Sequence, residues 1–152
     1  MFLPMDENIV IKELTAACDC YVQPICRLLS QLTSSTVDFT IETLETITAS
    51  DSSHLFVAEC NGEVVGMLTL GEYMAPTGRK MWIEDVVVDE AMRGRSLGRR
   101  LVEYAMVYAA GIGGGALMLT SRPSRLAANA LYRSCGFGIK ETNMYKKEIH
   151  AK

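Results

Sequence analysis

Two adjacent carboxylates, Glu84 and Asp85, interrupt an apolar segment that is otherwise typical of a β-strand, Lys80 to Val88. A carboxylate in partly apolar surroundings can accept a proton from a reacting group, or attract a cationic amine without proton transfer. Successive side chains of a strand point to opposite faces, so we expect the two to diverge, with Glu84 on the face of Trp82 and Val86. One of the two is then a solvent-facing charge or a structural ion-pair partner.

A turn rich in arginine and glycine follows this strand and opens a helix. Its sequence is Arg93-Gly94-Arg95-Ser96-Leu97-Gly98-Arg99-Arg100, which holds four arginines within eight residues. The first N–H groups of a helix lack intrahelical partners and the helix dipole favours an anion there. Small residues also let the backbone approach a phosphate. The segment is not a P-loop, because no Gly-Lys-Ser/Thr follows, and the alternative interpretation is a basic, solvated helix start.

A second glycine-rich run, Gly111 to Ala116, matches the letters of a dinucleotide-binding motif in the wrong context. It follows a helix and precedes a strand, whereas that motif needs a strand, a loop and then a helix. The surrounding stretch from Tyr104 to Ser121 carries no charge. We interpret it as a helix end, a turn and a buried strand, and not as a membrane span.

Three polar residues near the C-terminus share one face of a predicted helix. Arg125, Asn129 and Tyr132 lie at positions i, i+4 and i+7, so one face could meet a ligand. Ser124 is the expected N-cap and Gly136 the expected terminator. A tyrosine in such a place can protonate a leaving group, and the alternative is a half-buried tyrosine whose hydroxyl bonds to backbone.

The elements that must position these side chains follow from hydrophobic periodicity and turn residues. We predict, in order, a strand at Ile9–Glu13, a helix at Asp19–Leu32, a weaker helix around Ile41–Ile47, strands at His54–Cys60 and Glu63–Leu70 joined by Asn61-Gly62, a loop at Glu72–Arg79, a strand at Lys80–Val88, a helix at Leu97–Ala110, a strand buried on both faces at Ala116–Thr120, a helix at Arg125–Cys135, and one or two closing strands within Ile139–Glu148. This order predicts a single α/β domain over residues 1–152 with a mixed sheet.

Composition narrows the class of protein. The 152 residues are 49% hydrophobic and 22% charged, which excludes disorder, collagen and coiled coil as the whole answer. A net charge of -3 argues against a dedicated nucleic-acid or anionic-membrane binder. Met1 to Ile11 lacks the features of a signal peptide, so we expect a cytoplasmic protein.

The five cysteines also favour a cytoplasmic protein. Their odd number and irregular spacing predict reduced thiols that pack as small hydrophobes. The pair Cys18 and Cys20 is too close for a usual zinc pair, and we expect no metal site. Cys135 follows Tyr132 closely, but no histidine nearby in the sequence could activate it, so packing is the better interpretation.

Together the two motifs resemble the signatures of the Gcn5-related N-acetyltransferase (GNAT) superfamily, in its small, microbial-type, single-domain form. The Arg93-to-Gly98 loop resembles the family's acetyl-CoA signature, Arg/Gln-x-x-Gly-x-Gly/Ala after a strand, with Ser96 where a glycine is usual. Asn129, Tyr132 and Gly136-Phe137 resemble its last-helix signature. The Ile83–Val86 segment looks like polyamine-type and glucosamine-phosphate-type members, and Leu119–Arg125 resembles many small microbial acetyltransferases.

The resemblance implies a fold, a co-substrate and roles for named residues. It implies a mostly antiparallel central sheet of six to seven strands flanked by about four helices, with acetyl-CoA as co-substrate. The pantetheine arm would pair with the strand backbone, where one N–H would polarise the thioester, and the pyrophosphate would meet the helix start. Tyr132 would protonate the thiolate, Glu84 would be the base, acting through water, and Asp85 would contact the amine or shape the site. The implied cofactor-binding residues are Val86, Val87, Val88, Arg93, Gly94, Arg95, Ser96, Leu97, Gly98, Arg99, Asn129 and Tyr132.

The resemblance leaves the acceptor open. The main hypothesis is direct transfer of an acetyl group from the thioester to a primary amine of a small molecule or protein. Alternatives are a specific glucosamine-6-phosphate or polyamine acetyltransferase, a non-catalytic acyl-CoA-binding module, and, less well supported by the charge, a nucleic-acid-binding module. Acceptor residues are expected from Asp19–Ser50 and Glu72–Arg79, which carry no recognisable motif, and a homodimer is suggested only by analogy.

Overall fold

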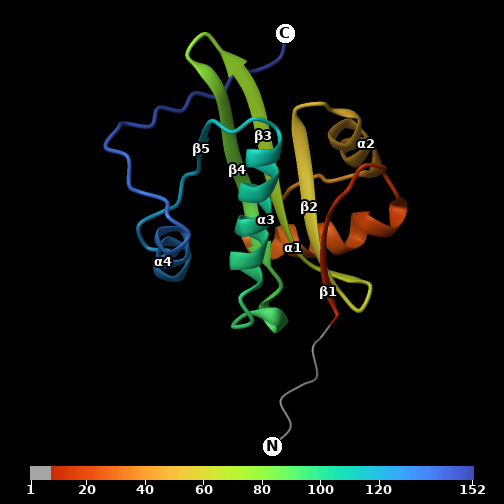
Figure 1. Ribbon diagram of the computed structural model, residues 1–152. Coiled ribbons are helices and arrows are strands. Elements are labelled where there is room, and N and C mark those ends of the chain that lie inside the picture. Colours follow the sequence, from red (N-terminus) through yellow and green to blue (C-terminus); the bar gives the residue numbers. More distant parts are fainter. Residues whose placement is uncertain (1–7) are drawn as a thin grey trace, which may run out of the picture.

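A single five-stranded sheet runs through the computed structural model, which describes residues 8–152 (Figure 1). The strands lie in the order β1-β2-β3-β4-β5; neighbours are antiparallel except β4 and β5, which are parallel. The strands are β1 (Ile9–Glu13), β2 (Ser53–Cys60), β3 (Glu63–Ala75), β4 (Gly78–Val88) and β5 (Ala116–Met118). The helices are α1 (Val22–Leu32), α2 (Ile41–Ala49), α3 (Leu97–Gly111) and α4 (Leu126–Ser134), with short 3-10 turns at Asp19–Tyr21 and Glu90–Met92.

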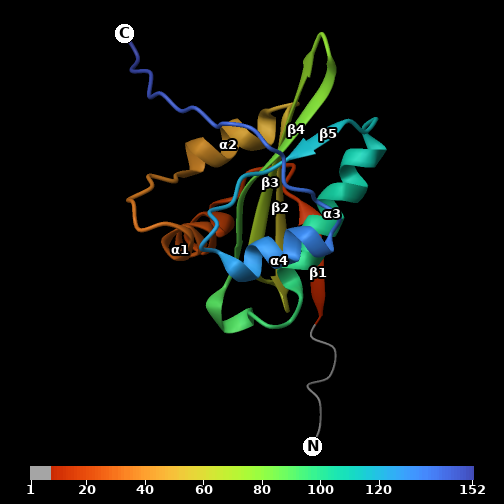
Figure 2. The same cartoon turned by 90° about the vertical axis from the view of Figure 1, so that its left-hand side faces the viewer.

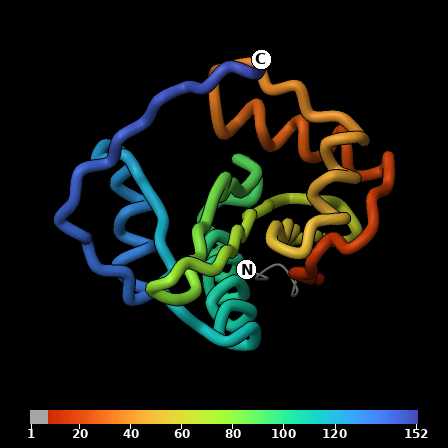
Figure 3. Tube along the Cα trace, turned by 90° about the horizontal axis from the view of Figure 1, so that it is seen from above, coloured from red at the N-terminus to blue at the C-terminus, as the bar shows by residue number. Residues whose placement is uncertain are grey.

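Side-chain alternation along the strands builds one core on each face of the sheet. In β2, Phe56 and Ala58 pack toward α3, whereas Leu55 and Val57 pack toward α1 and α2. Figure 2 shows α1 and α2 on one side of the sheet and α3 on the other. Seen from above, α4 lies to one side, apart from α1 and α2 (Figure 3). The predicted α/β class is therefore confirmed.

The predicted number of strands is wrong, because the described residues contain five. The segment expected to close the sheet forms no strand, and residues 138–152 extend along the surface as an exposed tail. Its larger apolar side chains, Ile139, Met144, Tyr145 and Ile149, are between 62% and 89% exposed. Strand propensity by itself does not make a strand, which also needs a hydrogen-bonding neighbour and a buried face.

The two hairpins differ in how well the sequence predicted them. Asn61-Gly62 does join β2 and β3, with φ of 51° and 84° as a type I′ turn requires. The predicted loop at Glu72–Arg79 is wrong, because β3 continues to Ala75 and β4 begins at Gly78. Cross-strand pairs such as Glu72 with Met81 extend the ladder through polar residues that had suggested a loop.

The glycine-rich run at 111–116 forms the turn between α3 and β5, as predicted, and packs against Arg79, close to the turn of the β3–β4 hairpin. A Cβ on Gly115 would lie 2.7 Å from the backbone oxygen of Arg79, and Gly115 has φ +139°, so only glycine fits. The strand that follows is shorter and more exposed than predicted. It comprises only Ala116–Met118, and Ala116 is exposed.

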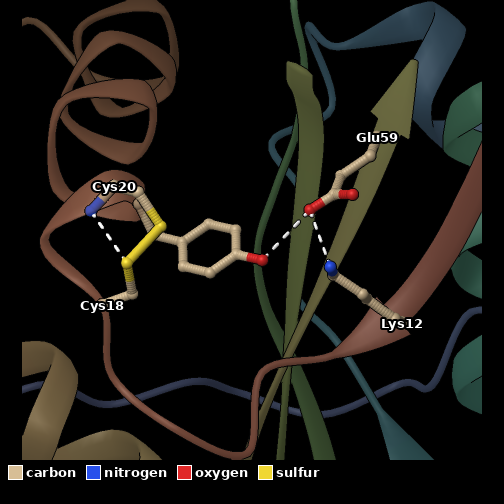
Figure 4. The surroundings of a disulfide bond; sticks show 5 residues. Lys12, Cys18, Cys20 and Glu59 are labelled. Carbon is tan, nitrogen blue, oxygen red and sulfur yellow. Dashed lines mark hydrogen bonds and ion pairs between the residues drawn. A yellow bond between two sulfur atoms is a disulfide. The ribbon is translucent and has the colours of Figure 1, made fainter. Parts of the chain in front are cut away.

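The expectation of five reduced cysteines is wrong for two of them. Cys18 and Cys20 form a disulfide in the exposed turn before α1 (Figure 4). The turn brings their Cα atoms to 5.2 Å, within the range that a disulfide needs. Beside it, the Glu59 carboxylate accepts a hydrogen bond from the Tyr21 hydroxyl and pairs with Lys12. The other three cysteines are free thiols.

Within residues 8–152, no helix has the length and apolar character that crossing a membrane would require. The stretch from Tyr104 to Ser121 divides into the end of α3, a turn and β5, as predicted. Most of the segment assessed for a signal peptide, Met1 to Ile11, lies outside the described residues.

A buried histidine joins the sheet to the end of α3. His54 Nδ1 lies 3.0 Å from the Glu13 carboxylate and His54 Nε2 lies 2.9 Å from the Glu72 carboxylate. The Tyr108 hydroxyl lies 3.0 Å from Nδ1, and Arg79 donates a 3.0 Å bond to Glu72. One side chain thus connects β1, β2, β3 and α3, and through Glu72 it reaches β4.

We expect His54→Leu to lower the free energy of unfolding by about 2 kcal/mol, because it leaves two half-buried carboxylates without their shared partner. Chemical denaturation followed by circular dichroism measures the change. His150→Leu, in the exposed tail, is the matched control and should leave stability unaltered. Equal stability of wild type and His54→Leu would contradict the structural role of this cluster.

Candidate active site

An extra residue in β4 disturbs the regular alternation of the sheet. Met67 pairs with Val87 and Thr69 pairs with Glu84, so Leu68 faces two residues of β4, Asp85 and Val86. This is a β-bulge, and Asp85 adopts φ of 52° in the left-handed region.

The bulge reverses the faces of β4 beyond it. Ile83 packs in the core beneath α3, whereas Val87 packs in the core beneath α1 and α2. In a regular strand, residues four apart would share a face. Val86 packs on the α3 side, so the predicted common face of Glu84 and Val86 is wrong.

Both carboxylates line one cavity of about 400 Å³, which we call the smaller pocket. Four consecutive residues of β4, Ile83 to Val86, line this pocket, so both carboxylates reach it at the edge of the strand. The pKa of Glu84 is raised, first by burial and then by the negative charge of Asp85. A carboxylate with a raised pKa is a stronger base than an ordinary one, which favours proton abstraction by Glu84.

A larger groove of about 1020 Å³ opens where β4 and β5 separate. The strand β5 pairs only with Lys80–Trp82, so beyond that point β4 has no strand paired to it on this side among residues 8–152. Val86, Val87 and Val88 line one wall, and the chain from Thr120 through Tyr132 contributes to the other. The three valines therefore form an open strand edge along the groove.

The start of α3 reaches the groove through a subset of the predicted residues. Arg93 and Gly98 line it, whereas Gly94, Arg95, Ser96, Leu97 and Arg99 are not among its lining residues. Ser96 is the N-cap in the left-handed conformation (φ 60°), with no capping bond from its side chain. This is the position where a glycine is usual in the family that the sequence resembles, and Ser96 adopts the conformation that glycine favours.

Two of the four arginines in the loop serve the fold. Arg99 bonds Glu103 at 2.8 Å and the Ser134 hydroxyl at 2.7 Å, and so ties α3 to the end of α4. Arg100 donates to the backbone oxygen of Ile9 in β1. The predicted basic cluster therefore does not act as a unit. Arg93 lines the groove, whereas Arg99 and Arg100 make contacts within the fold.

Tyr132 occupies the junction of the two cavities. Its side chain is buried, and burial raises the pKa of its hydroxyl, an effect that the nearby Arg125 charge opposes. The hydroxyl therefore carries its proton at neutral pH and is available as a donor. The residues common to both cavities are Leu32, Thr33, Val86, Thr120, Arg125 and Tyr132.

Asn129 lies apart from the cavities although it is near Tyr132 in sequence. Its side-chain amide donates to the backbone oxygens of Arg122 at 2.9 Å and Arg125 at 2.7 Å. Asn129 thus holds the turn that leads into α4, and it lines neither cavity. Arg125, and not the predicted Ser124, is the N-cap of α4.

The C-terminal end of α4 follows the prediction. Gly136 has φ of 93°, and the Phe137 N–H donates to the Tyr132 oxygen, which closes a Schellman motif. This termination fixes the last turn of the helix that carries Tyr132.

Several lining residues were missed because no sequence signal marks them. Leu29 and Leu32 of α1, and Thr33 and Val37 after it, line the smaller pocket. They fall in the segment expected to supply acceptor residues, but leucines at helical spacing resemble ordinary core positions. The other expected segment, Glu72–Arg79, lines neither cavity.

Comparison with known proteins identifies relatives of this chain. A family model described as the acetyltransferase (GNAT) family matches residues 22–137. The N-alpha-acetyltransferase RimI of Mycobacterium tuberculosis is 34% identical over 89 residues, 59% of this chain and 54% of that protein. A glucosamine 6-phosphate N-acetyltransferase of rice (Oryza sativa subsp. japonica) is 36% identical over 73 residues, 48% of this chain and 42% of that protein. The matches span about half the length of these two relatives.

One solved structure is similar to this one over nearly the whole chain. A putative acetyltransferase from Agrobacterium tumefaciens superposes with a TM-score of 0.80 and 28% identity. The superposition covers 91% of this chain and 99% of that one. The similarity therefore includes the sheet and the helices that frame the two cavities.

Proposed function

Because the chain belongs to the acetyltransferase (GNAT) family, whose enzymes use acetyl-CoA as co-substrate, we propose that it is an N-acetyltransferase. It transfers the acetyl group directly to a primary amine. The observation that carries the proposal is the meeting of two cavities at Tyr132, with the base candidate Glu84 in one and the open edge of β4 in the other.

The larger groove fits a long, anionic thioester. Its volume of about 1020 Å³ lies at the upper end of the range for small-molecule sites. Arg93 and Gly98 would bring positive charge and the first-turn N–H groups of α3 to the pyrophosphate. The unpaired edge at Val86–Val88 would bond the amide groups of the pantetheine arm, as an added strand does. A Cβ on Gly98 would lie 3.3 Å from Leu131, so the small residue also keeps α3 and α4 close.

The residues at the junction would divide the proton transfers between them. Acetyl-CoA supplies a thioester carbonyl that an amine can attack once the amine is neutral. Glu84 takes the proton of the incoming ammonium, through a water molecule, and a β4 backbone N–H polarises the carbonyl. As the C–N bond forms and the C–S bond breaks, Tyr132 gives its proton to the departing sulfur. The attacking nitrogen loses its second proton to solvent as the amide forms. Solvent then takes the first proton from Glu84 and returns one to Tyr132, so each turnover releases one proton overall.

Three further expectations stay predictions from the sequence. One is that residues 1–152 form a single acetyltransferase domain, another is a homodimer, and the third is a cytoplasmic location. Because Cys18 and Cys20 form a disulfide, these two cysteines do not support a cytoplasmic location. The main rival function, a non-catalytic acyl-CoA-binding module, would keep the groove but would not need Glu84 and Tyr132 at one junction.

We expect purified protein to bind acetyl-CoA in isothermal titration calorimetry, with a dissociation constant in the micromolar range. Arg93→Ala should weaken binding about 10-fold, because it removes a charge-assisted contact to phosphate. The matched control, Arg100→Ala, loses only an exposed bond to β1 and should bind as the wild type does. Absence of binding by the wild type at high micromolar concentration would refute the proposed function.

We expect Tyr132→Phe to lower kcat about 100-fold while the KM for acetyl-CoA changes less than 3-fold, since the ring stays and only the acid is lost. A free-thiol assay with saturating amine measures both constants. Tyr145→Phe, at a site 87% exposed, should leave kcat unchanged. An undiminished kcat in Tyr132→Phe would remove this residue from its role as the acid.

We expect the acid limb of the kcat/KM pH profile to report Glu84, which must be deprotonated to act. The charge of Asp85 contributes to the raised pKa of Glu84, so Asp85→Asn should move that limb to lower pH. Asparagine also tolerates the left-handed backbone at this position. Glu84→Gln should abolish the limb and lower the rate about 100-fold. A limb that is unaltered in both variants would assign the base elsewhere.

A further inference from the structure

The smaller pocket carries two unlike charges at separate points of its wall. Glu84 and Asp85 come from the bulge in β4, whereas Arg125 comes from the start of α4. Among the ion pairs within residues 8–152, none involves these three side chains. The carboxylates and the guanidinium are therefore available to pair with groups on a ligand.

Arg125 is placed to meet a ligand at the reaction centre. It lines both cavities and lies close enough to Tyr132 for its charge to act on that hydroxyl. Asn129 donates 2.7 Å to the backbone oxygen of Arg125, which fixes the backbone from which the guanidinium extends. A positive charge held there attracts an anionic group close to the attacking amine.

The remainder of the pocket offers apolar side chains. Leu29 of α1, Val37 of the following loop and Leu119 after β5 contribute to its lining. Val37 is 47% exposed, which is high for an aliphatic side chain that lines a cavity. A ligand with an apolar body would remove part of this surface from water.

From this arrangement, and on the basis of the proposed function, we infer that the acceptor is a small zwitterionic amine of the amino-acid class. Its amine lies beside Glu84 and Asp85, its single anionic group pairs with Arg125, and its apolar side chain contacts Leu29 and Val37. The acetyl transfer forms a C–N bond and breaks the C–S bond, with the proton movements already described. Arg125 is thus a specificity-determining residue.

The same charges disfavour two other acceptor classes. A polyamine has several cations, and one of them would lie near the Arg125 guanidinium. A sugar phosphate carries about two negative charges, which would meet one arginine and two carboxylates in the same pocket. Like charges held close together in a partly buried site oppose binding.

The test uses an acceptor pair that differs by one carboxylate. L-leucine and 3-methylbutylamine share the same side chain, and their acetylation by the full chain is followed by free-thiol release. The two amines differ in basicity, so the informative quantity is how Arg125→Gln changes the ratio of their kcat/KM values. The matched control is Arg133→Gln, an exposed arginine of the same helix that lines neither cavity.

We expect Arg125→Gln to lower the ratio of kcat/KM for leucine to kcat/KM for 3-methylbutylamine by 10- to 100-fold, with the acetyl-CoA dissociation constant within 3-fold of wild type. Arg133→Gln should leave the ratio unchanged. An equal effect of Arg125→Gln on both amines, or an equal loss of acetyl-CoA affinity, overturns the inference. If the wild type binds acetyl-CoA but acetylates neither amine, the inference about the acceptor is overturned, whereas the proposal that the groove binds acetyl-CoA stands. If the wild type does not bind acetyl-CoA, the proposed function itself is refuted.

Discussion

One additional residue in β4 determines how the rest of the site is arranged. The left-handed backbone at Asp85 shifts the register against β3 by one position. This shift places Glu84 and Asp85 in a common pocket and reverses the alternation of the valines that follow. In a regular strand, one carboxylate would point into the core beneath α3. A non-glycine residue in this conformation costs about 1–3 kcal/mol, and the long β3–β4 ladder holds it in place.

The second requirement is that α4 stays at a fixed distance from β4. Because α4 is not part of the sheet, packing and not strand pairing must hold it there. The short pairing of β5 with Lys80–Trp82 starts the separation, and α3 then acts as the spacer. Arg99 bonds the end of α4, and Gly98 contacts Leu131 on its inner face. The bond from Arg99 to Ser134 is an exposed hydrogen bond, which contributes little by itself, so the close packing at Gly98 is the stronger constraint on the groove. Tyr132 and Arg125 are positioned through this contact.

The sequence predicted those parts of the fold and site that depend on local patterns. Asn61-Gly62, the strand before Arg93 and the termination at Gly136 each have a short-range physical cause, and each was found. The bulge could not be predicted, because Asp85 in an apolar strand has the same local pattern with or without it. Asn129 and Arg99 were assigned to the cofactor from motif letters, yet their side chains bond neighbouring turns. The exposed tail at 138–152 depends on whether a neighbouring strand exists, which its own residues do not encode.

The structure also changes where the positive charge of the site comes from. The net charge of -3 and the run of arginines after β4 suggested a single basic turn as the anion site. Arg99 and Arg100 instead make contacts within the fold, and the groove is lined by Arg93 on one side and by Arg122 and Arg125 on the other. Charges on two opposed walls can hold separate anionic groups of a ligand, which one basic turn could not do. In the proposed ternary complex of a long thioester and a small acceptor, Arg93 would then bind the phosphate end of the thioester and Arg125 the anionic group of the acceptor.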